Sequence, residues 1–465
     1  MKIAFVLPDG VGVRNYLYAR LLPLLQENHE VVVISTLVDN DAVQDICNEI
    51  GREVSFFPLP EYSERVAVKF FREVGTYARL LRYTASQQNP TLMKNWRPKR
   101  NSLSKKLFYC LVELIGRGVR KSQKLRGFLD TKMEDLLRTA ASCGKCSELL
   151  ECIQPNVLLC THQRAINAVP LFLAARDMGI RTVSAIYSWD NLPKARLLVK
   201  ADEYLVWSDY MKRELEAYYP EEKHKPIHVT GTPQFEFYSD ENNYCSREAF
   251  CRDFGLDPTR KIICYSGGDT LTSPFDQCFL DDLAVTVKSM PLENQPQILL
   301  RRCPVDFSNR YDEVLTRHKD VICVSLPKWR QGDPAAWTLT YPLLDDVKLL
   351  VNTVRHCDAV YNVGSTMAHD FFTHGKPAIY ANYDPPAASG SGWSTETIYQ
   401  FQHFRSMPSK SCVEWVNSNN EILPTLEQVL SESYQPSPES RLWFDKIAGP
   451  KPENASQRIL KVLTQ

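Results

Sequence analysis

The sequence lacks a hydrophobic run long enough to cross a membrane, and it lacks an excess of charge of either sign. Its 55 Lys and Arg residues balance 55 Asp and Glu residues, so the overall charge does not indicate a nucleic-acid-binding protein. The longest apolar stretch, LFYCLVELIGRGV (107–119), is about a dozen residues long and contains Glu113. The amino-terminal apolar run meets Pro8 and Gly10 too early for a signal peptide. We therefore expect a cytoplasmic protein.

Motifs for metals and for several nucleotide enzymes are also missing. The 14 cysteines are scattered, as is typical of reduced thiols, and the C-x-x-C pair Cys143 and Cys146 has no second pair to enclose zinc. We therefore expect neither a metal nor a cofactor. The absence of GxxxxGK[ST], and of GxGxxG at the first helix, disfavours a P-loop NTPase and a dinucleotide enzyme.

The hydrophobic pattern of the 465 residues predicts two α/β halves. Strand-like runs at 2–7 and 30–36 flank a glycine-containing turn and a predicted helix from Val13 to Gln26, and a second series of strands begins at 261. We predict the α/β class with two Rossmann-like parallel-sheet domains facing a central cleft. The predicted units are residues 1–225 with a helical basic insertion at about 63–153, residues 226–440, and a carboxyl-terminal helix at 441–465 that packs back on the first domain.

The second half contains a candidate phosphate site in DAVYNVGSTMAHDFFTHGKP (358–377). A predicted strand ends at Gly364, and Ser365 and Thr366 then open a helix. The amides and positive dipole end of a helix attract phosphate, and the two hydroxyls add donors. The alternative is a plain helix cap. Asp370 lies one turn further on, where a carboxylate can accept hydrogen bonds from vicinal hydroxyls.

Two other strand ends of this half carry residues suited to a diphosphate. Gly267 and Gly268 follow a strand and permit close approach of the backbone to phosphate, although such a pair can equally form an ordinary turn. Arg301 and Arg302 end another strand, and their forked donors can neutralise a diphosphate leaving group. The alternative for either arginine is a surface salt bridge.

The first half offers candidates for the second substrate and for a base. In LPDGVGVRN (7–15), Gly10 and Gly12 allow a tight approach, while Asp9 and Arg14 can face the cleft. His162 follows another strand and is suited to take a hydroxyl proton near neutral pH, although a histidine in this position can also be purely structural.

The stretch IYSWDNLPKA (186–195) places polar residues after a buried strand. The face of Trp189 can support a sugar ring, Asp190 can act as a general base, and Asn191 can read hydroxyls. The alternative is a structural turn in which Asp190 caps a helix and Trp189 plugs the domain interface.

A basic segment lies between these regions. Residues 94–126 contain eleven Lys or Arg and one acid, with leucines at helical spacing. These leucines are Leu103, Leu107, Leu111 and Leu114. A solvated helix is one interpretation, and a helix lying on an anionic membrane face is the other. The aromatic residues are not interleaved for base stacking, so we expect no nucleic acid partner.

Three segments resemble known glycosyltransferases. GSTMAHDFFTHGKP resembles the donor motif of GT-B glycosyltransferases, although Asp370 stands where that family usually has Glu. SWDNL, the later VW and HVTGTPQF resemble a group of bacterial GT-B proteins of surface-carbohydrate synthesis, which are related to CDP-glycerol glycerophosphotransferase-like proteins. ILLRRCPVD resembles the R-x-H-P-x-D stretch of capsule and wall-polymer transferases, with Cys303 in place of His. The resemblance implies that the first domain binds the acceptor, that small residues at 364–366 hold the donor diphosphate, and that Asp370 holds the ribose.

The sequence thus predicts a metal-independent glycosyltransferase that moves a sugar from a nucleotide-diphosphate donor to a glycan or lipid-linked acceptor. The alternatives are a CDP-glycerol-type glycerophosphotransferase, a UDP-sugar 2-epimerase and an inactive GT-B-like scaffold. We expect it in the cytoplasm, with a peripheral position on the inner membrane face as an option. The predicted site residues are Asp190, His162 and Asp9 as candidate bases; Gly267, Gly268, Arg301, Arg302, Gly364, Ser365, Thr366 and Asp370 for the donor; and Gly10, Gly12, Arg14, Trp189 and Asn191 for the acceptor.

Overall fold

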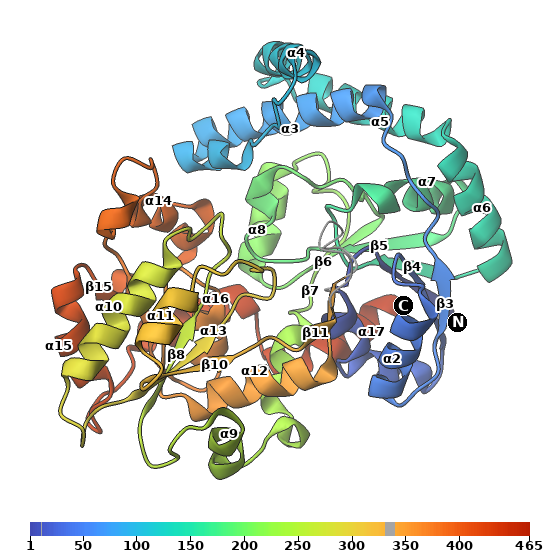
Figure 1. Cartoon of the computed structure of the whole chain (residues 1–465). Coiled ribbons are helices and arrows are strands. Elements are labelled where there is room, and N and C mark those ends of the chain that lie inside the picture. The colour runs from blue at the N-terminus through green and yellow to red at the C-terminus, as the bar shows by residue number, and fades with distance from the viewer. Residues whose placement is uncertain (11, 331–339) are drawn as a thin grey trace.

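The computed structural model describes residues 1–10, 12–330 and 340–465 (Figure 1). The amino-terminal half is built on a seven-stranded sheet of order β3-β2-β1-β4-β5-β6-β7 in which all neighbouring strands are parallel. Its strands are β1 (Lys2–Leu7), β2 (Glu30–Ser35), β3 (Ser55–Pro58), β4 (Val157–Cys160), β5 (Arg181–Ala185), β6 (Glu203–Val206) and β7 (Ile227–Val229). Helices accompany it at α1 (Leu21–Gln26), α2 (Asn40–Ile50), α7 (Val169–Asp177) and α8 (Asp209–Tyr218).

Helices cover both faces of this sheet, which explains why its central strands are continuously apolar. Alternate residues of β1 point to opposite sides: Phe5 packs with α1, whereas Val6 packs with α7. Cys143 and Cys146 lie buried in the second of these cores, where burial raises the pKa of Cys146 to about 12. No group of metal-ligating side chains occurs within residues 1–10, 12–330 and 340–465.

The prediction of one continuous helix from Val13 to Gln26 is wrong. The structure has a π-helical turn at Val13–Leu17, in which the Tyr18 amide donates to the Val13 carbonyl at 3.1 Å, and α1 begins only at Leu21. Pro23 has no amide hydrogen and is tolerated only in the first turn of a helix, so the helix must begin again shortly before it. Such π turns often occur at functional sites.

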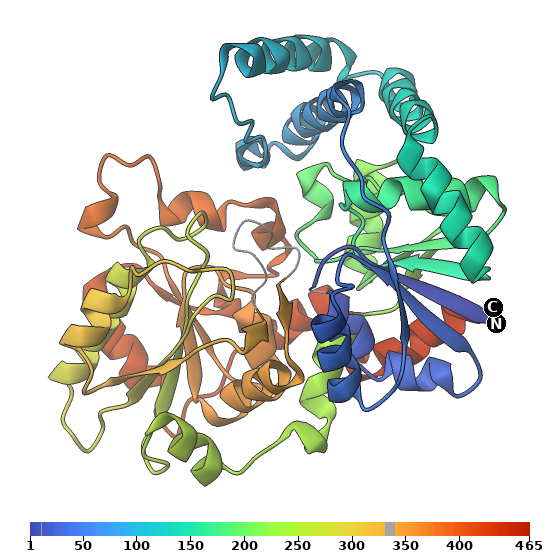
Figure 2. The ribbon, with the colours of Figure 1, turned by 45° about the vertical axis from the view of Figure 1, so that its right-hand side comes forward.

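Four helices lie between β3 and β4 and form the outer edge of this half (Figure 2). They are α3 (Val66–Gln87), α4 (Leu103–Val119), α5 (Gln123–Arg138) and α6 (Ala141–Ile153), with a short 3₁₀ segment at Pro90–Asn95. A buried ion pair between Arg79 of α3 and Asp130 of α5 at 2.5 Å fastens them, and Lys200 joins Asp130 at 2.9 Å from the main body of the domain.

The carboxyl-terminal half has a six-stranded parallel sheet of order β10-β9-β8-β13-β14-β15. Its strands are β8 (Ile262–Ser266), β9 (Gln297–Arg301), β10 (Ile322–Ser325), β13 (Ala359–Asn362), β14 (Ala378–Ala381) and β15 (Glu414–Val416), and a small antiparallel pair joins β11 (Trp329–Arg330) to β12 (Tyr341–Pro342). Its helices are α9 (Arg247–Phe254), α10 (Asp276–Ser289), α11 (Asp312–Arg317), α12 (Leu344–His356), α13 (Met367–Phe372), α14 (Thr395–Tyr399) and α15 (Ile422–Val429).

Two segments connect the halves. A 3₁₀ segment at Pro233–Ser239 follows β7, and the chain returns at its end through α16 (Pro438–Ala448) and α17 (Ala455–Leu463). Helix α17 packs on α1 in the first half, and Arg181 donates to the Val462 carbonyl at 2.8 Å. None of the helices within the described ranges is long and apolar enough to cross a membrane.

Candidate functional site

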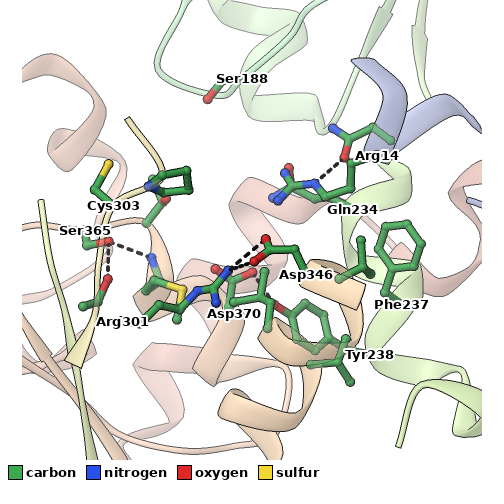
Figure 3. Close-up of a pocket in the computed structure, with 18 of the residues that line it drawn as sticks. Arg14, Ser188, Gln234, Phe237, Tyr238, Arg301, Cys303, Asp346, Ser365 and Asp370 are labelled. Carbon is green, nitrogen blue, oxygen red and sulfur yellow. Dashed lines mark hydrogen bonds and ion pairs between the residues drawn. The ribbon is translucent and has the colours of Figure 1, made fainter. Parts of the chain in front are cut away.

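A cavity of about 310 Å³ lies between the two halves. It sits at the carboxyl ends of the strands of both sheets, where parallel α/β folds bind their ligands. One wall is formed by residues that follow β8, β9 and β13, and the opposite wall by residues that follow β5 together with the π-helical turn. The 3₁₀ segment Pro233–Ser239, here called the crossing segment, closes one side with Gln234, Phe237 and Tyr238 (Figure 3).

Arg301 at the end of β9 is the most strongly positioned cation of the cavity. Its side chain is buried, and its Nη2 donates to both carboxylate oxygens of Asp346 at 3.1 and 3.0 Å. Asp346 is held in turn by the Lys328 amide at 2.8 Å and by the Trp329 indole N–H at 2.9 Å. Nη1 of Arg301 is buried and has no hydrogen-bond partner among the described residues. Arg301 thus lines the cavity with one guanidinium nitrogen bound to Asp346 and another without a partner among the described residues.

The loop after β13 places hydroxyl groups next to Arg301. Gly364 adopts a φ of +65°, and an added Cβ would come 3.0 Å from the Phe404 ring, so a side chain here is excluded by backbone and by packing. The Ser365 amide donates to Asn362 Oδ1 at 2.7 Å, and Ser365 Oγ accepts from the Met367 amide at 3.2 Å and lies 3.2 Å from Ser266 Oγ. Thr366 lines the cavity and is exposed. Two amides of this turn are thus engaged within the protein, and the side chains of Ser365 and Thr366 add hydroxyl groups to the cavity wall.

Asp370 in α13 lines the same wall. Its Oδ1 accepts a hydrogen bond from the Tyr238 hydroxyl at 2.8 Å, which ties α13 to the crossing segment. Burial raises the pKa of Asp370 to about 6, while the Tyr238 hydroxyl and the positive charges of Arg14 and Arg301 act in the opposite direction. A carboxylate with one fixed oxygen on a cavity wall can accept hydrogen bonds from ribose hydroxyls.

The glycine pair after β8 does not offer its amides to a ligand, contrary to our expectation. The Gly267 amide donates to the Arg301 carbonyl at 2.9 Å and the Gly268 amide donates to Asp276 at 2.8 Å. An added Cβ on Gly267 would come 2.7 Å from the Tyr311 hydroxyl, so close packing explains this glycine. Gly267 lies in the cavity wall and Gly268 does not.

Arg302 is also in the wall, but its guanidinium is largely engaged. Its Nη2 donates to the Ser308 carbonyl, and the guanidinium lies over the Tyr311 ring at 5.4 Å. Its Nε is buried without a partner among the described residues. Both neighbouring arginines therefore line the cavity with one buried nitrogen lacking a partner among the described residues, but Arg301 is held by a carboxylate whereas Arg302 is held by backbone carbonyls.

The opposite wall contains Arg14, Asn15, Tyr187 and Ser188. Arg14 projects from the π-helical turn, and its Nε donates to Asn15 Oδ1 at 3.0 Å. The Tyr187 amide donates to Gln163 Oε1 at 2.9 Å, which holds the strand end in place. Arg14 thus adds a positive charge across the cavity from Arg301 and Arg302.

The structure brings together two candidate bases that lie far apart in the sequence. His162 Nδ1 is 2.5 Å from Asp9 Oδ2, and His162 Nε2 is buried without a hydrogen-bond partner among the described residues. This is the arrangement in which a carboxylate orients an imidazole. The His162 ring stacks on Tyr187 with 4.5 Å between centroids, so the pair lies directly behind a wall residue and is not itself part of the wall.

Trp189 touches the cavity, but it mainly seals the interface between the halves. Only 3% of its surface is exposed. Its ring packs edge-on against three other rings, with centroid separations of 5.1 Å to His369 of α13, 4.9 Å to His403 and 6.2 Å to Trp443 of α16. Burial lowers the pKa of His369 to about 3 and that of His403 to about 4, so both rings are neutral near pH 7. This geometry favours the interface-plug alternative over an open platform for a sugar.

Asp190 and Asn191 form a closed turn outside the cavity wall. Lys194 Nζ lies 2.5 Å from Asp190 Oδ2, and Asn191 donates to Asp190 Oδ1 at 2.8 Å while accepting from Arg164 at 3.1 Å. Although burial raises the pKa of Asp190, the ion pair with Lys194 outweighs it and holds this pKa well below its usual value. A carboxylate of such low basicity is poorly suited to remove a proton, and the structure therefore opposes the predicted role of Asp190 as base.

Gly10 and Gly12 do not line the cavity. An added Cβ on Gly10 would come 2.1 Å from the Thr340 carbonyl oxygen of the other half, and one on Gly12 would come 2.8 Å from Thr161 Oγ1. Both glycines therefore permit close packing, and their predicted contact with an acceptor has no support in this geometry.

The cavity contains eight of the predicted site residues and several that the sequence did not reveal. The predicted ones in the wall are Arg14, Trp189, Gly267, Arg301, Arg302, Ser365, Thr366 and Asp370. Asp346 was missed because an acid near a helix start usually acts as a cap, and nothing in the sequence pairs it with Arg301. Tyr238 was missed because it follows HVTGTPQF, a stretch that was noted only for its resemblance to bacterial GT-B proteins.

Comparison with known proteins supports the fold. In sequence, the chain matches no protein-family model and no curated protein. Among solved structures it is similar to a Listeria monocytogenes protein described as a candidate UDP-N-acetylglucosamine 2-epimerase, with 10% identity, a TM-score of 0.57, and coverage of 100% of this chain and 95% of that one. It is also similar to the Neisseria meningitidis UDP-GlcNAc 2-epimerase bound to UDP-GlcNAc, with 11% identity, a TM-score of 0.50 and 100% coverage of both chains.

A third structure, the lipopolysaccharide outer core galactosyltransferase WaaB, has 12% identity, a TM-score of 0.44 and 100% coverage of both chains. At these identities the likeness concerns the fold alone. The two parallel sheets and the likeness to the first two structures confirm the predicted α/β class with two Rossmann-like domains facing a cleft.

Proposed function

We propose that the interdomain cavity binds a nucleotide-diphosphate sugar and that the protein transfers the sugar to a glycan or lipid-linked acceptor of surface polysaccharide synthesis. The observation that carries the proposal is Arg301, a buried cation that Asp346 holds by one nitrogen while Nη1 remains without a partner among the described residues. A buried donor without a partner is costly, and a ligand phosphate would satisfy it.

The neighbouring groups match the parts of such a donor. The Ser365, Ser266 and Thr366 hydroxyls lie beside Arg301 for the diphosphate, and Asp370 is one helical turn away for the ribose. Arg14 approaches from the other half and adds positive charge where the leaving diphosphate develops negative charge. Two arginines in a confined cavity can supply this stabilisation without a metal, so activity should survive chelation with EDTA.

The identity of the catalytic base is also part of the proposal. If the transfer inverts configuration, Asp9 and His162 are the best candidates, because Asp9 orients the ring and Nε2 is without a partner among the described residues. Tyr187 separates the ring from the cavity, so its side chain would have to shift when the acceptor binds. A transfer that retains configuration requires no protein base.

A stabilisation screen with UDP, GDP, CDP, CMP and dTDP tests the donor site. A nucleotide at about one hundred times its Kd contributes about 2.7 kcal/mol. For domains of this size, that corresponds to a rise in Tm of about 5–10 °C. Stabilisation by none of the five nucleotides would contradict the proposal and favour a non-catalytic scaffold.

Product analysis separates the enzymatic alternatives. Mass spectrometry after incubation with sugar nucleotides and with CDP-glycerol distinguishes sugar transfer from glycerophosphate transfer. Turnover of a UDP-sugar without any acceptor would instead indicate a 2-epimerase, and this control matters because two of the structures compared above are, or are described as, 2-epimerases.

A further inference from the structure

Helix α4 turns a row of leucines away from the protein. Leu103, Leu107, Leu111 and Leu114 are 74%, 64%, 48% and 65% exposed. At 3.6 residues per turn they fall within about 80° of the helix circumference and extend for about 16 Å along its axis. A helix on a protein surface normally shows polar residues to water, so this outward face has the reverse polarity.

The orientation of α4 is fixed by the packing of its other face. Val112 is fully buried in a cluster with Tyr77 of α3, and Tyr109 is also buried. Gly116 sits so close to α3 that an added Cβ would come 2.7 Å from the Tyr77 ring. Because these residues lie opposite the leucines on the helix, the leucine row cannot turn inward without losing this packing.

The surface around the leucine row is strongly basic. Residues 94–126 contain eleven Lys or Arg, and their single acid, Glu113, is already occupied by the Trp96 indole N–H at 2.7 Å and by an ion pair with Arg100. The exposed cations of the segment are Lys94, Arg97, Lys99, Lys105, Lys106, Arg117, Arg120, Lys121 and Lys124. The chain as a whole has no net charge, so this concentration is local.

The helices that pack beside α4 are anchored to both halves of the molecule. Arg79 and Asp130 hold α3 and α5 together, and Lys200 of the first half joins them. At the end of α3, Asn89 donates to the Gln400 carbonyl at 3.1 Å, and Arg405 donates to the Gln87 carbonyl at 2.6 Å. Helix α4 is therefore held firmly in place, and it lies at the outer edge of the molecule in both views (Figures 1 and 2).

From this arrangement we propose that the outward face of α4 binds an anionic lipid bilayer, with the four leucines inserted among the acyl chains and the surrounding Lys and Arg on the headgroups. An interfacial helix has this combination of one apolar face and cationic flanks, and it enters the bilayer by about 5–10 Å. A nucleic acid would bind the Lys and Arg side chains but would leave the leucines exposed to water. A protein partner would have to be both apolar and acidic at the contact.

Co-sedimentation of the full chain with lipid vesicles tests the proposal. We expect binding to phosphatidylcholine vesicles containing about 30 mol% phosphatidylglycerol, much weaker binding to phosphatidylcholine alone, and a decrease in about 0.5 M NaCl. The double variant Leu107→Gln, Leu111→Gln should bind the anionic vesicles at least tenfold more weakly. The matched control Leu292→Gln, at a leucine of the other half that is 79% exposed, should bind like the unchanged protein.

Two further measurements keep the outcomes distinct. The double variant should keep its Tm and its stabilisation by a nucleotide, because the changed side chains are exposed and distant in sequence from the cavity wall. Absence of binding to anionic vesicles, or equal binding by the double variant, would overturn the proposal. It would also be overturned if sedimentation equilibrium showed an oligomer of the full chain that the double variant dissociates, since the leucines would then cover a second copy.

Discussion

Replacing Asp370 with asparagine is expected to stabilise the protein above about pH 6 while weakening its binding of a nucleotide. Burial raises the pKa of this carboxyl from 3.8 to about 6 in the folded protein. Between about pH 4 and 6 the folded protein keeps a proton that the unfolded chain has lost, so stability falls as the pH rises through this window. Asparagine carries no charge and removes this pH dependence.

The size of the effect follows from the pKa difference. About two pKa units correspond to at most ~3 kcal/mol, because each unit is worth 1.36 kcal/mol. The Tyr238 hydroxyl, which donates to the carboxylate at 2.8 Å, would donate to a neutral amide oxygen instead and return about 1 kcal/mol of this gain. We therefore expect a net stabilisation of ~1–2 kcal/mol at pH 7.5, or a rise in Tm of about 4 °C.

Thermal melting of both proteins between about pH 4 and 8 measures this difference. The advantage of Asp370→Asn should be near zero at the acid end and reach its plateau above about pH 6. Asp282→Asn is the matched control: burial also raises the pKa of Asp282, which accepts from the Tyr383 hydroxyl at 2.8 Å, but Asp282 does not line the cavity. The Asp282→Asn protein should gain stability without losing affinity for the nucleotide. A difference that does not vary with pH, or a destabilised Asp370→Asn protein at pH 7.5, would refute the reasoning.

Three other predictions concern the cavity. Arg301→Lys should keep an ion pair with Asp346 and most of the stability of the protein. It removes the nitrogen that corresponds to Arg301 Nη1, so it should raise the Kd for a nucleoside diphosphate about 10–100-fold. An unchanged Kd in calorimetry would contradict this. Trp189→Ala should destabilise the protein by ~3–5 kcal/mol, whereas Trp189→Phe should restore most of the stability and leave acceptor KM unchanged; a raised KM at unchanged Tm would support a sugar platform. For an inverting transfer, His162→Gln and Asp9→Asn should lower kcat, by about 10²–10⁴-fold for His162→Gln, without changing nucleotide Kd; normal kcat would remove this pair as base.

The sequence was sufficient for the architecture because parallel sheets require continuous apolar strands separated by helices. Runs such as IAFVL and EVVVIS could be read directly. In the second half, the ends of the runs QILLR and AVYN located Arg301 and Ser365 on one wall, with Asp370 in the helix that follows AVYN. The break between the π-helical turn and α1 was missed, because helical periodicity continues across it while Pro23 forces a new start.

The site could be predicted less well, since side-chain partners depend on contacts between distant segments. Glycines at the end of β8 look like a phosphate turn, but Asp276 and the Arg301 carbonyl use their amides. The SWDN turn looks like a reactive cluster, and Lys194, only four residues away, neutralises Asp190. The pairing of Arg301 with Asp346 joins β9 to α12 and leaves no trace in the local sequence.

The most direct measurement is a crystal structure of the protein with the nucleoside diphosphate that stabilises it most. We predict that the diphosphate lies between Arg301 Nη1 and the Ser365 hydroxyl, that the ribose hydroxyls contact Asp370, and that Arg14 faces the phosphates from the opposite wall. A nucleotide bound elsewhere, or in the cavity with its ribose at Arg301 and its phosphates at another wall, would contradict it.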